Sequence, residues 1–262
     1  MWNDILIAAL LLVGTGVIAG VILVLATHFM HVPVDEKVSK IRECLPGANC
    51  GACGYTGCDG YAEAIASGEA EPYKCTPGGK ATSEALSELL GVEIKTEQFV
   101  AVVGCNHGLD KANVDYLYEG RQSCASVKFL YGGQLQCKYG CLGFGDCVNV
   151  CDYDAIKIVD GIAKVNREKC VGCAKCAKTC PSSVISLIPY DTKVTVNCHN
   201  LEKGAVSRKK CSASCIGCMK CTKVCETGAI SVENFLAHID TAKCINCGKC
   251  AEVCPQGCIL VH

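Results

Sequence analysis

Residues 215–225 read CIGCMKCTKVC, and residues 244–254 read CINCGKCAEVC. Both stretches follow the pattern C-x2-C-x2-C-x3-C, in a chain of 262 residues that contains 26 cysteines. So high a cysteine content is typical of either a disulfide scaffold or a metal protein. Disulfide scaffolds are usually short secreted chains, whereas cysteines that follow one another at this spacing favour a shared metal centre. The two stretches therefore predict thiolate-bound metal.

The pattern belongs to an internal repeat in the second half of the chain. A third run, CVGCAKCAKTC, fills residues 170–180, and CVNVC at 147–151 aligns with the last part of the other three. This is the ferredoxin signature, in which three cysteines bind one [4Fe–4S] cluster and the fourth crosses to the neighbouring cluster. For the final two runs this rule predicts two ligand sets, namely Cys215, Cys218, Cys221 and Cys254, and Cys244, Cys247, Cys250 and Cys225.

The upstream pair of sites is less regular, because the alignment on Cys147 puts Phe144 at the middle ligand position. We infer that an additional cysteine, Cys137, takes the vacant place, with Cys105 and Cys124 as alternative donors. CSASCIG at 211–217 resembles CKYGCLG at 137–143, which suggests that Cys211 is a relic of the same extended motif. The predicted sets are Cys137, Cys141, Cys147 and Cys180, and Cys151, Cys170, Cys173 and Cys176.

A further group of cysteines lies in residues 48–58, ANCGACGYTGC. The glycines between them are small enough to let backbone amides approach cluster sulfides. The sequence that follows predicts a short helix ended by Gly68, and such a helix can fold Cys75 back towards the glycine-rich loop. This predicts a ligand set with Cys75 as its fourth member and Cys44 as the alternative to it, the set being Cys50, Cys53, Cys58 and Cys75.

An uncharged apolar stretch, ILIAALLLVGTGVIAGVILVLAT, fills residues 5–27. As a helix it would extend about 35 Å, enough to cross the hydrocarbon core of a membrane. The preceding MWND holds an acid and no Lys or Arg, which does not fit a cleaved signal peptide. Because Lys37, Lys40 and Arg42 follow the stretch, the positive-inside rule predicts a single span with its N-terminus outside and the iron–sulfur domains in the cytoplasm.

The stretch CLPGANCGACGYTGCDGYAEAIASGEAEPYKCTPGG, residues 44–79, resembles the four-cysteine iron–sulfur module in the B subunits of Rnf complexes. The order of an N-terminal helix, this module, YGCLGFGDC and ferredoxin repeats is also similar to that family. The resemblance implies a membrane complex that oxidises reduced ferredoxin, reduces NAD and exports Na⁺ or H⁺. It implies that this chain receives the ferredoxin electrons at the inner (cytoplasmic) membrane and passes them to other membrane and flavin/NAD subunits, with no nucleic acid as partner.

The charge distribution suggests where ferredoxin docks. Between Lys164 and Cys225 the chain has twelve Lys and Arg against three acids, a formal +9, although its net charge is −1. This block either offsets the negative charge of the clusters or forms a face that steers an acidic ferredoxin. The candidate docking surface is the run Arg208, Lys209 and Lys210, together with four lysines inside the cysteine runs, Lys175, Lys178, Lys220 and Lys223.

The sequence thus predicts an α+β chain with five parts: a transmembrane anchor (1–30), a four-cysteine module (31–91), a linker with a strand and a helix (92–136), an irregular dicluster ferredoxin-like domain (137–200) and a regular one (201–262). Five [4Fe–4S] clusters, or about 20 irons, would use twenty cysteines. The cysteines without a predicted role are Cys44, Cys105, Cys124, Cys198, Cys211 and Cys258.

Catalytic bond-making is not predicted, because the chain has no recognisable dinucleotide-binding loop, Walker loop or flavin-attachment motif. Two other classes of protein remain open at this point. One is an anchored polyferredoxin subunit of another membrane dehydrogenase. The other is a zinc-bound structural scaffold, which would be colourless because Zn²⁺ is d¹⁰.

Overall fold

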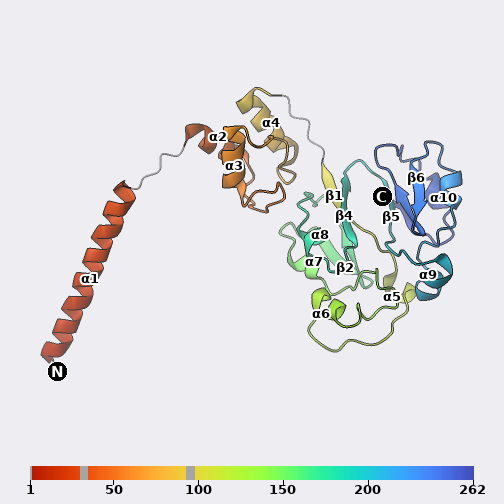
Figure 1. The fold of residues 1–262 in the computed structure, drawn as a ribbon, viewed down its shortest axis with the longest axis horizontal. Helices are drawn as coiled ribbons and strands as arrows, with labels where there is room; N and C mark the ends of the chain where they lie inside the picture. The colour runs from red at the N-terminus through yellow and green to blue at the C-terminus, as the bar shows by residue number, and fades with distance from the viewer. Residues whose placement is uncertain (1, 30–34, 93–97) are drawn as a thin grey trace.

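The computed structural model describes residues 2–29, 35–92 and 98–262 (Figure 1). Its first element is helix α1 (Trp2–Phe29). The stretch Ile5–Leu25, 21 residues, is long and apolar enough to cross a membrane, and it is the one such helix in the described part of the chain. Its large apolar side chains are exposed, which suits a helix whose solvent is lipid.

Three helices, α2 (Glu36–Cys44), α3 (Cys58–Ser67) and α4 (Gly79–Leu90), form the next unit. The predicted helix after Cys58 is confirmed as α3. It ends at Gly68, whose φ of +79° is left-handed and whose N–H donates to the carbonyl of Ile65. The helices pack around a small apolar core that includes Ile41, Tyr61 and Leu86.

The next unit extends from β1 (Phe99–Val103) to β4 (Ile185–Pro189) and corresponds to the first predicted ferredoxin-like domain with its upstream segment. It has two pairs of antiparallel strands. Strand β1 pairs with β4, and β2 (Ile156–Val159) forms a hairpin with β3 (Ile162–Val165). The short helices α7 (Asp146–Asn149) and α8 (Lys175–Thr179) carry cysteines between these strands. Strand β1 lies within the segment 92–136, together with α5 (Gly108–Lys111) and α6 (Cys124–Phe129).

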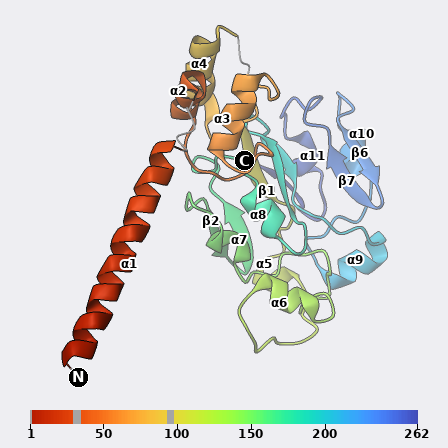
Figure 2. The same ribbon diagram turned by 60° about the vertical axis from the view of Figure 1, so that its left-hand side comes forward.

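The second unit repeats this plan beside the first (Figure 2). Strand β5 (Val194–Val196) pairs with β8 (Ile259–Val261), and β6 (Ile230–Glu233) forms a hairpin with β7 (Leu236–Ile239). Helix α9 (Gly204–Lys210) precedes its cysteines, which lie around α10 (Lys220–Lys223) and α11 (Lys249–Glu252). In both units, a strand from upstream of the cysteine runs pairs with the unit's last strand. The strand pairing therefore crosses the predicted boundaries at 136/137 and 200/201.

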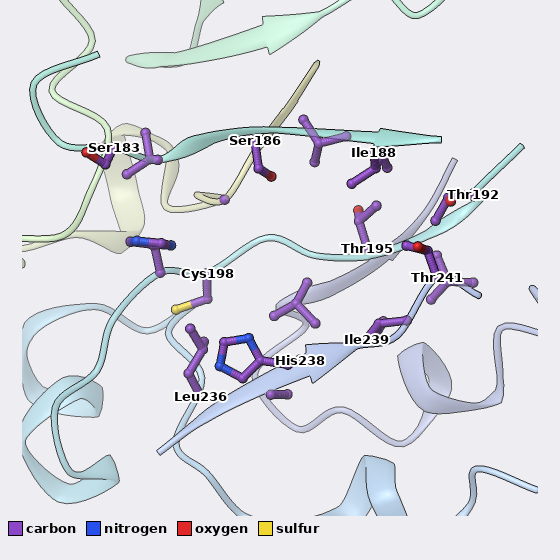
Figure 3. A pocket seen from close by; sticks show the side chains of 17 residues that line it. Ser183, Ser186, Ile188, Thr192, Thr195, Cys198, Leu236, His238, Ile239 and Thr241 are labelled. Carbon is purple, nitrogen blue, oxygen red and sulfur yellow. The ribbon is translucent and has the colours of Figure 1, made fainter. Parts of the chain in front are cut away.

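The two units meet along β1 and β5. The side chain of Asn197, next to β5, donates from Nδ2 to the carbonyl of Val103 in β1 at 3.0 Å. A cavity of about 280 Å³ opens on this seam, between residues of β1, β4, β5 and β7 (Figure 3). Cys198 is the one cysteine among its lining residues, and Leu236 and His238 line the same cavity. The seam thus places the segment after β5 directly against the first unit.

Candidate metal centres

All 26 cysteines carry free thiols. Among the residues that the structure describes, no group of three or more His, Cys, Asp or Glu is arranged to hold a single metal ion. A [4Fe–4S] cubane makes a different demand, because four thiolates bind four separate irons and stand farther apart than the ligands of one ion. The relevant test is whether the thiols of each set share one neighbourhood, with backbone amides directed at sulfur.

The N-terminal set meets this test through Cys75. Its thiol is buried, and burial raises its pKa to about 11. The amide of Gly78 lowers that pKa, and the negative charges of three other thiolates raise it further, those of Cys58, Cys53 and Cys50. Ionised together, the four would repel one another, so bound iron would stabilise all of them at once.

Two side chains fix the loops that carry this set. The hydroxyl of Tyr61 donates to the carbonyl of Glu71 at 2.7 Å and accepts from the amide of Lys74 at 3.0 Å. It thereby anchors the segment that leads into the fourth cysteine. Asn49 accepts a hydrogen bond from the amide of Cys58 at 2.8 Å through its Oδ1, which holds the glycine-rich loop against the start of α3.

The alternative ligand Cys44 is placed differently. Its thiol donates to the carbonyl of Lys40, one turn back in α2, at 3.3 Å. Its pKa is raised by burial and then by the charge of Glu43, and no other thiolate is among the causes. This placement favours Cys75 over Cys44 as the fourth ligand.

We expect Cys75→Ala to remove about four irons per chain and to leave the ferredoxin repeats loaded, because a cubane that loses one thiolate is no longer held at four corners. The matched change Cys44→Ala should keep the full iron content. Chemical iron analysis and electron paramagnetic resonance of oxygen-free protein measure both. Loss of iron in Cys44→Ala with full retention in Cys75→Ala would reverse the assignment.

The regular set of the first unit is gathered around Cys176. Burial raises the pKa of this thiol to about 11, followed by the charges of Cys170 and Cys173, and Cys151 adds a smaller effect. The amide of Ala101 in β1 donates to Sγ of Cys170 at 3.4 Å. N–H···S bonds of this kind stabilise thiolates and tune the potential of a bound cluster.

The loop between these cysteines turns on left-handed residues, Gly172 at φ +67° and Ala174 at φ +62°. A Cβ at Gly172 would lie 2.5 Å from the carbonyl oxygen of Phe99, so only glycine fits there. Left-handed residues in such loops turn successive backbone N–H groups towards one concave space, which suits an anionic cluster.

In the irregular set, burial raises the pKa of Cys147 to about 12, followed in order by the charges of Cys141, Cys124, Cys180 and Cys176. The alternative donor Cys124 therefore lies with Cys141 and Cys147. For Cys137, the predicted donor, burial raises the pKa most, and the largest contribution from another thiolate comes from Cys105.

A carboxylate that the sequence analysis missed fixes Cys124. Oγ of Ser123 and the amide of Ala125 both donate to Oδ2 of Asp146 at 3.0 Å. Since Ser123 and Ala125 flank Cys124, and Asp146 directly precedes Cys147, this one carboxylate ties the two cysteines together. The only sequence signal for it was its position inside the distinctive stretch CLGFGDC.

In the second unit, burial raises the pKa of Cys221 to about 11, followed by the charges of Cys215 and Cys218. The pKa of Cys250 is likewise raised by burial, with contributions from Cys244 and Cys247. The predicted crossing ligands are Cys225, whose Sγ lies 3.7 Å from Oγ1 of Thr227, and Cys254, whose Sγ lies 3.5 Å from that of the buried Cys258.

The middle cysteines of the two final runs differ from the others in exposure, because Cys218 and Cys247 are the exposed cysteines of the chain. Exposed apolar side chains lie beside them, Met219 and Ile245. This unit therefore presents both of its predicted centres to solvent.

The N-terminal module meets the first unit near Cys173. Burial raises the pKa of this thiol, and the amide of Lys175 lowers it. The next contribution is the negative charge of the Cys50 thiolate, which raises the pKa again. Tyr153 lies near the same two thiolates. Its pKa is raised by burial and then by the negative charges of Cys173 and Cys50. Two predicted centres thus adjoin across this contact.

Comparisons with known proteins match iron–sulfur families to three stretches of the chain that contain many of these cysteines. The family described as "Putative Fe-S cluster" matches residues 45–77, a range that holds Cys50, Cys53, Cys58 and Cys75 and leaves out Cys44. A 4Fe-4S dicluster domain matches residues 214–258, and a 4Fe-4S binding domain matches residues 162–185. The chain is therefore an iron–sulfur protein of the electron-transfer type.

Three relatives cover most of the chain. The B subunit of the Na(+)-translocating ferredoxin:NAD(+) oxidoreductase complex of Acetobacterium woodii is 42% identical over 92% of this chain and 73% of its own length. The proton-translocating counterpart from Clostridium ljungdahlii is 37% identical over 91% and 85%. The B subunit of the ion-translocating oxidoreductase complex of Methanosarcina acetivorans is 37% identical over 87% and 88%. The resemblance seen in the sequence is thereby confirmed, and the chain belongs to the family of B subunits of ion-translocating ferredoxin:NAD(+) oxidoreductase (Rnf) complexes.

Proposed function

We propose that this chain takes electrons from reduced ferredoxin and passes them to the other subunits of an ion-translocating ferredoxin:NAD oxidoreductase. The cysteine sets described above would hold [4Fe–4S] clusters, which supply one-electron redox chemistry when bound. The protein's own part is to hold the thiolates, to direct amides at sulfur and to bind the donor. In this proposal the chain is anchored by α1 in the cytoplasmic membrane, with its N-terminus outside and the cysteine-bearing units in the cytoplasm.

One observation carries the proposal, namely that the chain holds several neighbouring cysteine sets between an exposed C-terminal unit and the module that follows α1 in the sequence. Cys218 and Cys247 are exposed in the second unit. In the first unit Cys147 lies within reach of Cys176, a member of the neighbouring set. Cys173 in turn lies near enough to Cys50, in the module that follows α1 in the chain, for the two thiolates to interact electrostatically. Such a series suits electron entry at the C-terminal unit and delivery near the membrane.

The predicted docking residues are not equivalent. Arg208 and Lys209 are exposed in the last turn of α9. Lys210 is partly buried and forms an ion pair with Glu202. Helix α9, which carries both exposed cations, lies against the second unit's first signature cysteine, because Oγ of Ser207 donates to the carbonyl of Cys215 at 3.1 Å. We therefore assign the steering of an acidic ferredoxin to Arg208 and Lys209 and a structural pairing to Lys210.

Reversal of both exposed charges, Arg208→Glu with Lys209→Glu, should slow electron transfer from reduced ferredoxin about 10-fold or more at low salt. The deficit should shrink as salt rises, because screening over a Debye length of about 8 Å at physiological ionic strength removes steering. Stopped-flow bleaching of the cluster absorbance measures the rate, and iron analysis checks that the cluster content is unchanged.

A matched control lies on the β2–β3 hairpin, where the exposed residues Lys157 and Lys164 face each other across the strands. Lys157→Glu with Lys164→Glu changes the net charge by the same amount. An equal slowing in this control, or an unaltered rate in the α9 variant, would remove Arg208 and Lys209 from the docking surface. A wild-type chain that is not reduced by ferredoxin at any salt concentration would overturn the proposed function itself.

A further inference from the structure

Three cysteines without a predicted role, Cys105, Cys198 and Cys211, lie at the seam between the two ferredoxin-like units, together with Cys137. Cys137 and Cys211 are buried, and the other two are half-buried. In each unit one of these cysteines comes two residues after the upstream strand, Cys105 after β1 and Cys198 after β5. The other comes four residues before the unit's first signature cysteine. Each unit therefore supplies an equivalent pair.

Equivalent hydrogen bonds accompany the equivalent positions. The amide of Cys141 donates to Sγ of Cys105 at 3.4 Å, and the amide of Cys215 donates to Sγ of Cys198 at 3.2 Å. A third donor crosses the seam, since Nδ2 of Asn200 in the second unit lies 3.4 Å from Sγ of Cys137 in the first. Donors directed at three of these four sulfurs are the arrangement expected around metal-bound thiolates.

The backbone brings the two pairs together through Asn113. Its N–H donates to the carbonyl of Lys210 and its carbonyl accepts from the amide of Gln136, both at 2.9 Å. Lys210 and Gln136 directly precede Cys211 and Cys137. The two cysteines therefore follow backbone segments that are both hydrogen-bonded to Asn113. Ala112 also forms an isolated β-bridge with Cys211.

The other two cysteines approach across the seam between β1 and β5. A Cβ placed on Gly104, which precedes Cys105, would lie 3.7 Å from the carbonyl oxygen of Cys198. The electrostatic interactions of Cys211 also indicate that these cysteines lie close together. Burial raises the pKa of Cys211 to about 11, and after the amide of Ala213, which lowers it, the next causes are the thiolates of Cys105 and Cys137.

His107 lies at the edge of this group of cysteines. Both of its ring nitrogens face backbone carbonyls, Nε2 that of Cys141 at 2.9 Å and Nδ1 that of Gly108. With both ring nitrogens turned to backbone carbonyls, the buried side chain lies next to Cys105. It is therefore a neighbour of the four sulfurs and not one of the ligands.

We propose that Cys105, Cys137, Cys198 and Cys211 form an additional iron–sulfur site between the two units, and that the irregular set takes Cys124 in place of Cys137. Four thiols in one neighbourhood suit a [4Fe–4S] cluster, each releasing its proton as its sulfur binds iron. The tie between Cys124 and Cys147 through Asp146 supplies the irregular set with its fourth thiolate, so neither site lacks one. The inference rests on the same iron–sulfur chemistry as the proposed function and raises the count from five clusters to six.

The test is the metal content of the full chain, purified in detergent and reconstituted with iron and sulfide without oxygen. Wild type should hold about 24 irons per chain, and Mössbauer spectra should assign them to [4Fe–4S] clusters. Cys105→Ala and Cys211→Ala should each hold about 20, and the double variant should hold about 20 as well, because both residues serve one site. Cys124→Ala combined with Cys137→Ala should fall to about 16, because these residues serve different sites. Cys44→Ala is the control and should match wild type.

A wild-type content of about 20 irons, with Cys105→Ala and Cys211→Ala unchanged, would overturn the additional site. A fall to about 16 in Cys105→Ala with Cys211→Ala would overturn it too, because it would place the two residues in separate sites. The iron content of the wild-type chain distinguishes six clusters from five even if a variant fails to fold. A chain with about 24 irons that ferredoxin does not reduce would leave the site standing and overturn only the proposed function.

Discussion

NAD reduction by the assembled complex should fall to its ferredoxin-free background when Cys58 is replaced by alanine. Cys58 starts α3 and is buried among the thiols of the N-terminal set, the set that adjoins the first unit through Cys50 and Cys173. Loss of this set would interrupt the series between the ferredoxin-like units and the membrane subunits. Reduction of the remaining clusters by ferredoxin should persist, because the exposed second unit is untouched.

Two measurements on the same preparation separate these effects. Steady-state NADH formation reports the whole path, and stopped-flow bleaching after mixing with reduced ferredoxin reports entry alone. Cys44→Ala, in the same module, should retain both activities. Normal NADH formation by a Cys58→Ala complex that lacks about four irons would show that electrons leave the chain by another route.

Gly143→Ala should remove the iron of the irregular set and lower the temperature at which the chain unfolds. Gly143 has a φ of +79°, and an added Cβ would lie 2.3 Å from the carbonyl oxygen of Gly161 in the β2–β3 turn. Left-handed strain costs about 1–2 kcal/mol, and overpacking against backbone adds about 1–3 kcal/mol. Because Gly143 lies between Cys141 and Cys147, the loop must move and its thiolates with it.

Gly228→Ala is the matched control, since Gly228 has a φ of +64° and nothing within 4 Å of an added Cβ. It should cost only the left-handed strain and keep its iron. Circular dichroism during heating and iron analysis compare the two variants. Equal losses in both would mean that backbone conformation, and not the contact with Gly161, makes glycine necessary at residue 143.

The parts of this chain that were predictable from sequence are those that local spacing determines. The signature runs specify which cysteines share a loop, and Gly68 marks the end of α3 because a left-handed cap requires glycine. The sequence favoured Cys137 and kept Cys124 only as an alternative, because the choice depends on Asp146 and on the seam, contacts between residues far apart in the chain. The pairing of β5 with β8 is equally non-local, since it joins strands more than sixty residues apart.

The equivalence of the two units has a consequence for how such a chain could arise. A solitary unit offers only one pair of seam cysteines, so two copies would have to associate before four sulfurs could meet. Covalent fusion supplies the second pair at an effective concentration of about millimolar or more, whatever the abundance of the protein. The halves are then released from symmetry and can diverge, as the second residue after each strand-end cysteine has done. That residue is the imidazole-bearing His107 in one half and the amide-bearing Asn200 in the other.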